Sequence, residues 1–434
     1  MDETGKICGY LQTVRQRSGG EDASVVMDGK MVRGFRQLAI VLLLCIGVAG
    51  ATTKHKAVRH VTALHRAGVR RAVSRRGVRA SAGLRRVHGR RVHRYVEQFT
   101  ASSFVDNVGA GDVTAGEDPV VRAAAMEALG NMNGTALAID PSSGRILAMV
   151  NQHLALSAGA EPCSTIKVAV ALAALKEGLV KSDTPVNLGG HYSVDMTHAL
   201  ARSVNAYFEV LGRAMGFERV KHYANEFGLG ELAGYNIPGE QLGVYPDTEL
   251  PAADGGVGRM CSFGESISMT PLQLGALVSA IANGGTLYYL QHPTSQEDLQ
   301  NFVPKVKRLL NIQDVIPQIR PGMEGAVDFS NGTARSLRMN FAQFPIFGKT
   351  GTCSNNGTRY GWFVSYGDAP TGRIVTVIFL NGNREVYGPK AAELTGEFYR
   401  AMYERNYFGP RTESPLSFQP KSAVAGAQNS GGGQ

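Results

Sequence analysis

Three short segments of the sequence carry side chains suited to nucleophilic chemistry. They are Ser164-Thr165-Ile166-Lys167, Ser203-Val204-Asn205 and Lys349-Thr350-Gly351, which read S-x-x-K, S-x-N and K-T-G. A serine hydroxyl is a poor nucleophile at neutral pH and must lose its proton as it attacks. A lysine three residues further along a helix lies on the same face, so its amine can reach the serine oxygen. The first segment therefore predicts Ser164 as a nucleophile and Lys167 as its base.

A lysine acts as a base at neutral pH only if burial or a second nearby cation lowers its pKa. Lys349 is our candidate for that second cation. We expect Ser203 to relay the proton to the leaving amine and Asn205 to hold a substrate amide. A lysine base also removes the need for a catalytic histidine.

The local sequence around each segment predicts the element that must position it. Ser164 precedes the apolar, alanine-rich run VAVALAAL, which predicts a helix that begins near the serine. Ser203 and Asn205 lie between two helical patterns. Lys349 follows one apolar run and precedes two others that are rich in β-branched residues, at 362–364 and 374–380, which indicates antiparallel strands. We therefore expect Lys349 on a strand that faces Ser164 on its helix.

Taken together and in this order, the three motifs resemble the set of penicillin-binding proteins and class A β-lactamases. The resemblance extends to the segments 135–149, 264–274, 282–285, 351–352 and 362–363. It covers about 118–407, roughly two thirds of the chain, and points to the transpeptidase domain of penicillin-binding proteins. The fold that this resemblance implies is α+β, with a five-stranded antiparallel sheet flanked by helices and a mainly helical subdomain.

Hydrophobic patterns along the chain agree with such a mixed domain. They predict helices at 119–132, 164–177, 206–215, 218–227, 271–283 and 389–406, and strands within 135–150 and 344–380.

The resemblance implies D,D-transpeptidation of peptidoglycan stem peptides through an acyl-enzyme on Ser164, without a cofactor or metal ion. It assigns substrate binding to Thr350, Gly351 and Thr352, and it implies that the backbone N–H groups of Ser164 and Thr352 form an oxyanion hole. β-Lactams would then be covalent inhibitors. The same active site also serves D,D-carboxypeptidases, β-lactamases and β-lactam sensors without turnover, and these alternatives stay open. The segment 264–274 favours the transpeptidase.

The N-terminal region predicts export. Residues 37–49 are an apolar run that follows Arg33 and Arg36 and ends at Ala49-Gly50-Ala51, which is the layout of a secretory signal. We interpret 31–53 as a cleaved signal peptide or a membrane anchor, and 1–30 as an over-extended start of the gene. The catalytic domain is therefore expected outside the cytoplasm, in the periplasm or on the outer face of the membrane.

A strongly basic segment follows the apolar run. Residues 54–94 hold 14 Lys or Arg, five His and no acidic residue, whereas the other 31 basic and 36 acidic residues leave a net charge of −5 elsewhere. We expect 54–117 to be a disordered linker whose basic part binds an anionic membrane or cell-envelope surface, and not nucleic acid. Basic residues directly after an apolar run normally favour retention inside the cell, which opposes export.

The five cysteines do not suggest a disulfide framework. We expect Cys163, Cys261 and Cys353 to be free and buried. Cys163 and Cys353 would nevertheless lie close if the helix start faces the strand. The last residues, 408–434, are rich in Ser, Gly, Ala and Gln, and we expect a disordered tail.

Overall fold

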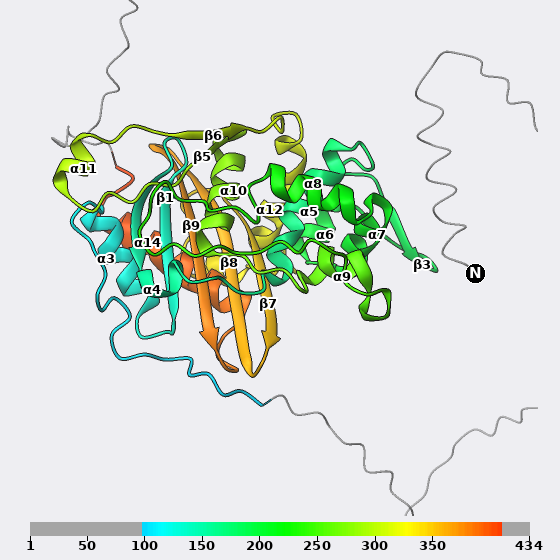
Figure 1. Cartoon of the computed structure of the whole chain (residues 1–434), viewed down its shortest axis with the longest axis horizontal. Helices are drawn as coiled ribbons and strands as arrows, with labels where there is room; N and C mark the ends of the chain where they lie inside the picture. The colour runs from blue at the N-terminus through cyan, green and yellow to red at the C-terminus, as the bar shows by residue number, and fades with distance from the viewer. Residues whose placement is uncertain (1–97, 410–434) are drawn as a thin grey trace, which may run out of the picture. The chain divides into compact units, whose positions relative to one another are not determined.

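The computed structural model describes residues 98–409 (Figure 1). A sheet with its covering helices forms one part of this unit, and a group of helices beside the sheet edge forms the other. The predicted signal or anchor at 31–53, the basic residues 54–94 and most of the predicted tail, from 410 onward, lie outside the described residues. The expected start of the tail at 408 is too early, because Phe408 is buried in the core against Phe344. None of the helices between residues 98 and 409 has the length and apolar composition needed to span a lipid bilayer.

The sheet has five antiparallel strands in the order β2-β1-β9-β8-β7, as the α+β prediction requires. Its strands are β1 (Gly134–Asp140), β2 (Arg145–Val150), β7 (Ile346–Asn355), β8 (Thr358–Ala369) and β9 (Gly372–Gly382). Strand β7, which carries the K-T-G motif, lies at one edge, so the backbone groups on its outer side are not taken up by a sheet neighbour.

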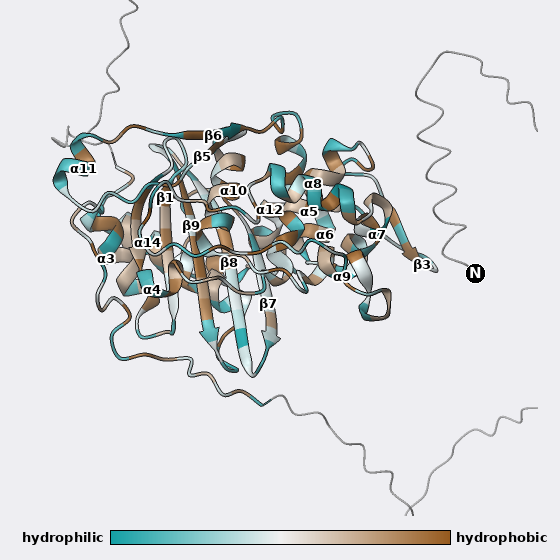
Figure 2. Cartoon of the chain, viewed as in Figure 1, coloured by the Kyte–Doolittle hydropathy of each residue, from teal (hydrophilic) through white to brown (hydrophobic). Residues whose placement is uncertain are grey.

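Helices cover both faces of the sheet because successive strand residues point to opposite sides. Ala136 and Ala138 of β1 join the core formed with α3 (Pro119–Leu129) and α14 (Gly388–Glu404). Leu137 and Ile139 instead lie near Gly275 of α10 (Pro271–Asn283), on the other face. Strands β1 and β9 are accordingly hydrophobic along most of their length (Figure 2).

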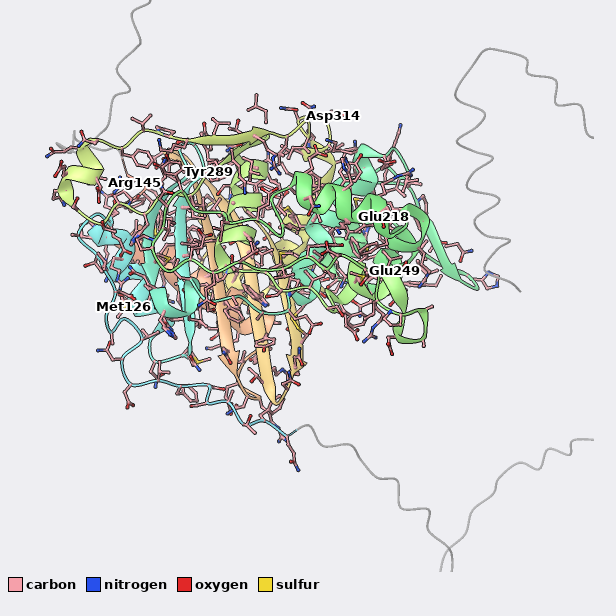
Figure 3. The ribbon with its side chains drawn as sticks, in the orientation of Figure 1. Met126, Arg145, Glu218, Glu249, Tyr289 and Asp314 are labelled. Carbon is pink, nitrogen blue, oxygen red and sulfur yellow. A yellow bond between two sulfur atoms is a disulfide. The ribbon has the colours of Figure 1, made fainter. Side chains whose placement is uncertain are left out.

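The helical part surrounds α5 (Lys167–Lys176), whose residues Val168–Leu175 are all buried. A helix that is apolar on every side needs neighbours on every side. These neighbours are α6 (Met196–Ala201), α7 (Asn205–Met215), α8 (Phe217–Glu226), α9 (Gly256–Phe263) and α12 (Ile316–Asp328). Glu218 and Glu249 mark this part in Figure 3, and Met126 and Arg145 mark the far end of the sheet.

Shorter elements complete the described chain. They are α4 (Gln152–Ala155), η1 (Cys163–Ile166), β3 (Val186–Gly189), β4 (Tyr192–Val194), η2 (Ala252–Asp254), β5 (Thr286–Tyr288), α11 (Gln296–Gln300), β6 (Val306–Leu309) and α13 (Ser336–Asn340).

Residues 98–117, which we expected in a disordered linker, instead pack against the domain. Ser103 and Val108 are buried, and Thr100 N donates a hydrogen bond to the carbonyl of Gly357 at 2.8 Å. The buried carboxylate of Glu117 accepts a hydrogen bond from Met149 N. The expected start of the folded domain at 118 is therefore too late, because these contacts make the preceding 20 residues part of its surface layer.

Candidate active site

The nucleophile candidate Ser164 lies in the short turn η1, which continues directly into α5. Lys167 is the first residue of α5, and its Nζ atom lies 2.6 Å from Ser164 Oγ. The i, i+3 spacing of the motif therefore places the amine beside the hydroxyl, as the sequence predicts. The first turn is a 3-10 helix, in which residues three apart lie one above the other and the two side chains come especially close.

The S-x-N motif reaches the same amine from the junction of α6 and α7. Ser203 has φ +56°, and the bonds from Ser203 N to the Leu200 carbonyl and from Val204 N to the Ala199 carbonyl close the end of α6. Lys167 Nζ donates to Ser203 Oγ at 3.2 Å. Lys167 Nζ also donates to Oδ1 of Asn205 at 2.6 Å, and Asn205 is the first residue of α7.

Burial changes the protonation chemistry of both motif lysines. The side chain of Lys167 is fully buried, and this burial, followed by the charge of Lys349, holds its pKa well below the ordinary value, while Glu209 opposes the shift. Lys349 is also fully buried, which lowers its pKa to about 7. The lowered pKa favours the neutral form of Lys167, and a neutral amine is able to accept a proton from Ser164.

Strand β7 brings the K-T-G motif against the nucleophile turn. An added Cβ on Gly351 would lie 2.9 Å from the Pro162 carbonyl oxygen, so only glycine allows this close approach. The Thr350 hydroxyl donates to the hydroxyl of Thr333 at 2.7 Å, and the Thr352 hydroxyl accepts from Gly388 N at 2.7 Å.

The structure thus gathers Ser164, Lys167, Ser203 and Asn205 through direct contacts around one amine. Lys349 acts on Lys167 electrostatically, and its own Nζ donates to the Thr350 carbonyl at 2.9 Å. Thr350 and Gly351 are buried, whereas Thr352 is exposed at the same strand.

A disulfide joins Cys163 to Cys353, with their Cα atoms 5.6 Å apart. Our prediction of free thiols is therefore wrong for these two residues, although their expected proximity is correct. The physical reason is that the helix start and β7 meet at this point, which brings together cysteines 190 residues apart in sequence. Cys261 is free and buried, as predicted.

Sequence reasoning missed two residues that support the site. Thr333 contacts the K-T-G motif, but a lone threonine in an Asn-Gly-Thr turn carries no signal of this contact. Trp362 donates from Nε1 to the Glu161 carbonyl at 3.0 Å, two residues before Cys163. Trp362 is the single tryptophan of the chain, and this rarity was the one feature of the sequence that could have marked it as a residue supporting the site.

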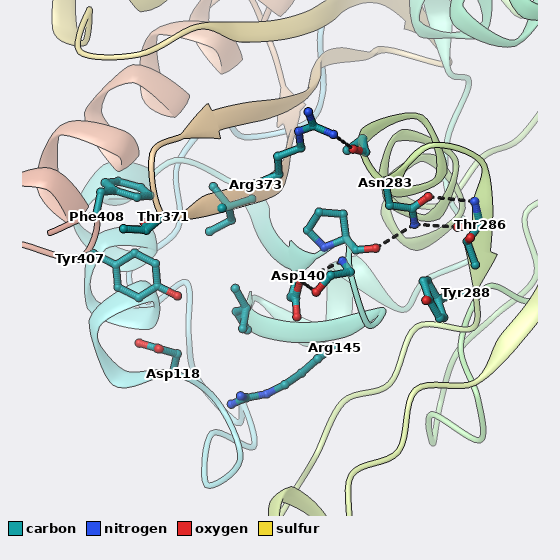
Figure 4. A pocket seen from close by; sticks show the side chains of 16 residues that line it. Asp118, Asp140, Arg145, Asn283, Thr286, Tyr288, Thr371, Arg373, Tyr407 and Phe408 are labelled. Carbon is teal, nitrogen blue, oxygen red and sulfur yellow. Dashed lines mark hydrogen bonds between the residues drawn. The ribbon is translucent and has the colours of Figure 1, made fainter. Parts of the chain in front are cut away.

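A separate cavity of about 690 Å³ lies at the far end of the sheet (Figure 4). The turns after β1 and β8, the end of α10 and the residues after α14 line it, with Arg145, Arg373 and Tyr407 among them. None of the motif residues contributes to its lining. The three motifs therefore meet where β7 packs against the nucleophile turn and the helical part, away from this cavity.

Comparison with known proteins identifies the family. Residues 134–403 match the model of the penicillin binding protein transpeptidase domain. Stage V sporulation protein D of Bacillus subtilis is 26% identical over 317 residues, which are 61% of this chain and 48% of that protein. Peptidoglycan D,D-transpeptidase MrdA of Acinetobacter baumannii is 26% identical over 394 residues, which are 71% of this chain and 57% of that protein. The chain thus spans about half the length of these relatives.

Solved structures agree on the fold. A Pseudomonas aeruginosa PBP2 in complex with WCK 5153 has a TM-score of 0.54 at 20% identity and covers 67% of this chain and 77% of that one. The Helicobacter pylori PBP2 in complex with MreC has a TM-score of 0.56 at 21% identity, over 66% of this chain and 63% of that one. With the family model matching more than half of its length, the chain belongs to the family of penicillin-binding proteins with a transpeptidase domain.

Proposed function

We propose that this protein is a D,D-transpeptidase that acts on peptidoglycan stem peptides through an acyl-enzyme on Ser164. The observation that carries the proposal is the 2.6 Å contact between Ser164 Oγ and the fully buried amine of Lys167. Burial lowers the pKa of that amine, which favours the neutral form that can accept the serine proton.

Acylation follows from this geometry. Ser164 Oγ attacks the carbonyl carbon of the penultimate D-alanine, and its proton passes to Lys167. The new O–C bond gives a tetrahedral intermediate whose oxyanion is held by the backbone N–H groups of Ser164 and Thr352. The C–N bond then breaks, and the proton returns from Lys167 through Ser203 to the leaving amine of the terminal D-alanine.

The K-T-G strand provides the substrate site in this proposal. Lys349 supplies a positive charge for the terminal carboxylate of the stem peptide, and the exposed Thr352, whose hydroxyl oxygen accepts from Gly388 N, offers its O–H on the same strand. Strand β7 is an edge strand, so an extended peptide can pair with its outer backbone groups. The side-chain amide of Asn205 retains its N–H groups for a substrate carbonyl while its oxygen binds Lys167.

Deacylation decides between the transpeptidase and its alternatives. An acceptor amine that attacks the acyl carbon gives a cross-link, whereas water gives D,D-carboxypeptidation or, with a β-lactam, hydrolysis of the drug. The relatives named D,D-transpeptidases support an amine acceptor. Analysis of the products from a stem peptide, with and without an added amine, distinguishes these outcomes.

The place of action is the cell envelope in this proposal. The apolar run at 37–49 would export or anchor the chain, and the basic residues 54–94 would hold it to an anionic membrane or cell-wall surface. Peptidoglycan stem peptides are the substrate class, and β-lactams are the covalent inhibitors.

Mass spectrometry after incubation with penicillin tests the proposal. We expect one adduct, located on the peptide that contains Ser164, which persists for a penicillin-binding protein and disappears rapidly for a β-lactamase. Ser164→Ala should abolish the adduct, because the paired lysine then has no hydroxyl to activate. Ser193→Ala, at an exposed serine of β4, is the matched control and should be labelled normally. Full labelling of Ser164→Ala would refute the assignment of the nucleophile.

A further inference from the structure

The disulfide lies next to both proposed oxyanion-hole donors. Cys163 immediately precedes Ser164, and Cys353 immediately follows Thr352. A single covalent bond therefore ties the backbone of the nucleophile turn to the backbone of the K-T-G strand. The two N–H groups that must point at one oxyanion lie on these two segments, on either side of the bond.

The backbone of Cys163, beside Ser164, has an unusual conformation. Its φ is +51°, in the left-handed region that favours glycine, and Cys163 is almost fully buried. A strained residue persists only where the surrounding structure holds it, and such strain is concentrated at functional sites. Glycine would adopt this conformation without strain, whereas cysteine adopts it at a cost in conformational energy.

Neighbouring contacts fix the same turn from the sheet. The Trp362 indole N–H donates to the Glu161 carbonyl, and the indole itself stacks on Phe379 with ring centroids 3.9 Å apart. Pro162 packs against Gly351, whose missing side chain leaves room for the turn. The disulfide is the covalent member of this set of contacts, and it is the member closest to Ser164.

The bond is chemically accessible from one side. Cys353 is partly exposed and its neighbours Thr352 and Ser354 are exposed, whereas Cys163 is buried. A small dithiol can therefore attack the sulfur of Cys353 and release Cys163 as a thiolate. Its second thiol then displaces Cys353, so that the dithiol becomes an intramolecular disulfide and gives two electrons to the protein.

We propose that the Cys163–Cys353 disulfide is a positioning element that holds the Ser164 and Thr352 N–H groups in register, so that acylation is fast only in the oxidised enzyme. This inference rests on the proposed acyl-enzyme function. The two cysteines touch no reacting atom and act through the backbone of their neighbours. Reduction leaves the Lys167 contacts with Ser203 and Asn205 intact, since neither sulfur takes part in them.

Saturation kinetics of acylation by a fluorescent penicillin test this inference on the full chain. Reduction with dithiothreitol should lower the limiting acylation rate constant by roughly 10- to 100-fold, the scale of a misplaced reacting group, without raising the concentration for half-saturation. Reoxidation should restore the rate. The limbs of the pH–rate profile should stay in place, because the disulfide does not position the lysines.

Variants separate a positioning role from general stabilisation. Cys353→Ser and the pair Cys163→Gly with Cys353→Ser should be slow and insensitive to dithiothreitol, whereas Cys261→Ala should respond to the reductant like the parent. Thermal unfolding of each variant confirms that the molecules assayed are folded. Thiol counting shows that the parent is reduced. If the reduced parent then acylates at the rate of the oxidised parent, the positioning role of the disulfide is refuted and the proposed function stands. If the oxidised parent forms no adduct on Ser164, the proposed acyl-enzyme function itself is refuted.

Discussion

Asn205 Oδ1 lies 2.6 Å from Lys167 Nζ, the same distance that separates this amine from Ser164 Oγ. The asparagine thus orients the amine from one side while the serine meets it from the other. Because an amide oxygen carries no full charge, Asn205 positions Lys167 without the increase in pKa that a carboxylate would cause. The residue type at this position therefore matters as much as its size.

Asn205→Asp tests this relationship. A carboxylate beside Lys167 favours the charged lysine and raises its pKa, so the rising limb of the pH–rate profile for acylation should move to higher pH. At pH 7 the limiting acylation rate constant at saturating penicillin should fall, and part of it should return as the pH is raised. Asn187→Asp, at an exposed position of β3, is the control. A rising limb that stays in place would contradict the assignment of Lys167 as the base.

Lys167→Ala should lose acylation by about three decades, on the scale of removing a nucleophile's partner. The protein should still fold, because the substitution removes a buried amine whose burial carries a desolvation cost. Lys176→Ala, which affects an ion pair with Glu226 at the other end of α5, is the matched control. Stopped-flow labelling with a fluorescent penicillin measures both variants, and a parent-like rate for Lys167→Ala would exclude a lysine base.

Local sequence signals encode the ends of several helices, and the prediction was correct where it followed them. Helix α10 runs from Pro271 to Asn283 as expected, because Thr270 and Gln273 form a capping box before it and Gly284 ends it with φ +94°. Helix α3 ends at Leu129 and not at 132, since Gly130 already has a positive φ. The three motifs were assignable because each needs only nearby residues to define its element.

Features that depend on tertiary packing escaped prediction. Helix α12 contains Pro321 and two glycines, which made its sequence a poor helix candidate. It forms because Gly322 lets the helix approach Leu200 of α6 closely, a contact between distant segments. The disulfide was missed for the same reason, since neither cysteine carries a local signal of a partner 190 residues away.

We expect Lys349 to produce the falling limb of the pH–rate profile for acylation. Its pKa is lowered to about 7 by burial, so the free enzyme loses the positive charge for the substrate carboxylate as the pH rises above that value. The apparent second-order rate constant for acylation should therefore fall near pH 7. Lys349→Arg keeps a permanent charge and should abolish this limb, even if its overall rate is lower. A falling limb that persists unchanged in Lys349→Arg would assign it to another group.

The buried Lys349 should lower the free energy of unfolding at acidic and neutral pH. Below pH 7 it is charged in the folded and unfolded states, and the buried charge is destabilising. Between pH 7 and its ordinary pKa of 10.5 the unfolded chain binds more protons, so the free energy of unfolding rises with pH. Lys349→Met should raise this free energy at pH 6 by about 5 kcal/mol, because the pKa falls from 10.5 to about 7 and each unit of pKa is worth about 1.4 kcal/mol. Chemical denaturation at pH 6 and pH 9 should show a smaller gain at pH 9.

Truncations at the N-terminus separate the basic residues 54–94 from the catalytic unit. A protein that starts at residue 97 keeps the hydrogen bonds of Ser103 to Asn383 N and Glu385, and it should acylate at the parent's rate. It should lose binding to vesicles with anionic lipids or to isolated cell walls. The parent's binding should weaken with salt, because the Debye length is only about 8 Å at physiological ionic strength.

A shorter protein that starts at 118 provides the contrast. It lacks Val108 from the core and Asp112, which pairs with Arg122 at 2.6 Å, so it should unfold at a lower temperature than the protein that starts at 97. If the longer truncated protein still bound anionic surfaces as tightly as the parent, the tether would lie elsewhere in the chain. If it failed to acylate, the basic residues would belong to the catalytic unit, and our separation of the two functions would be wrong.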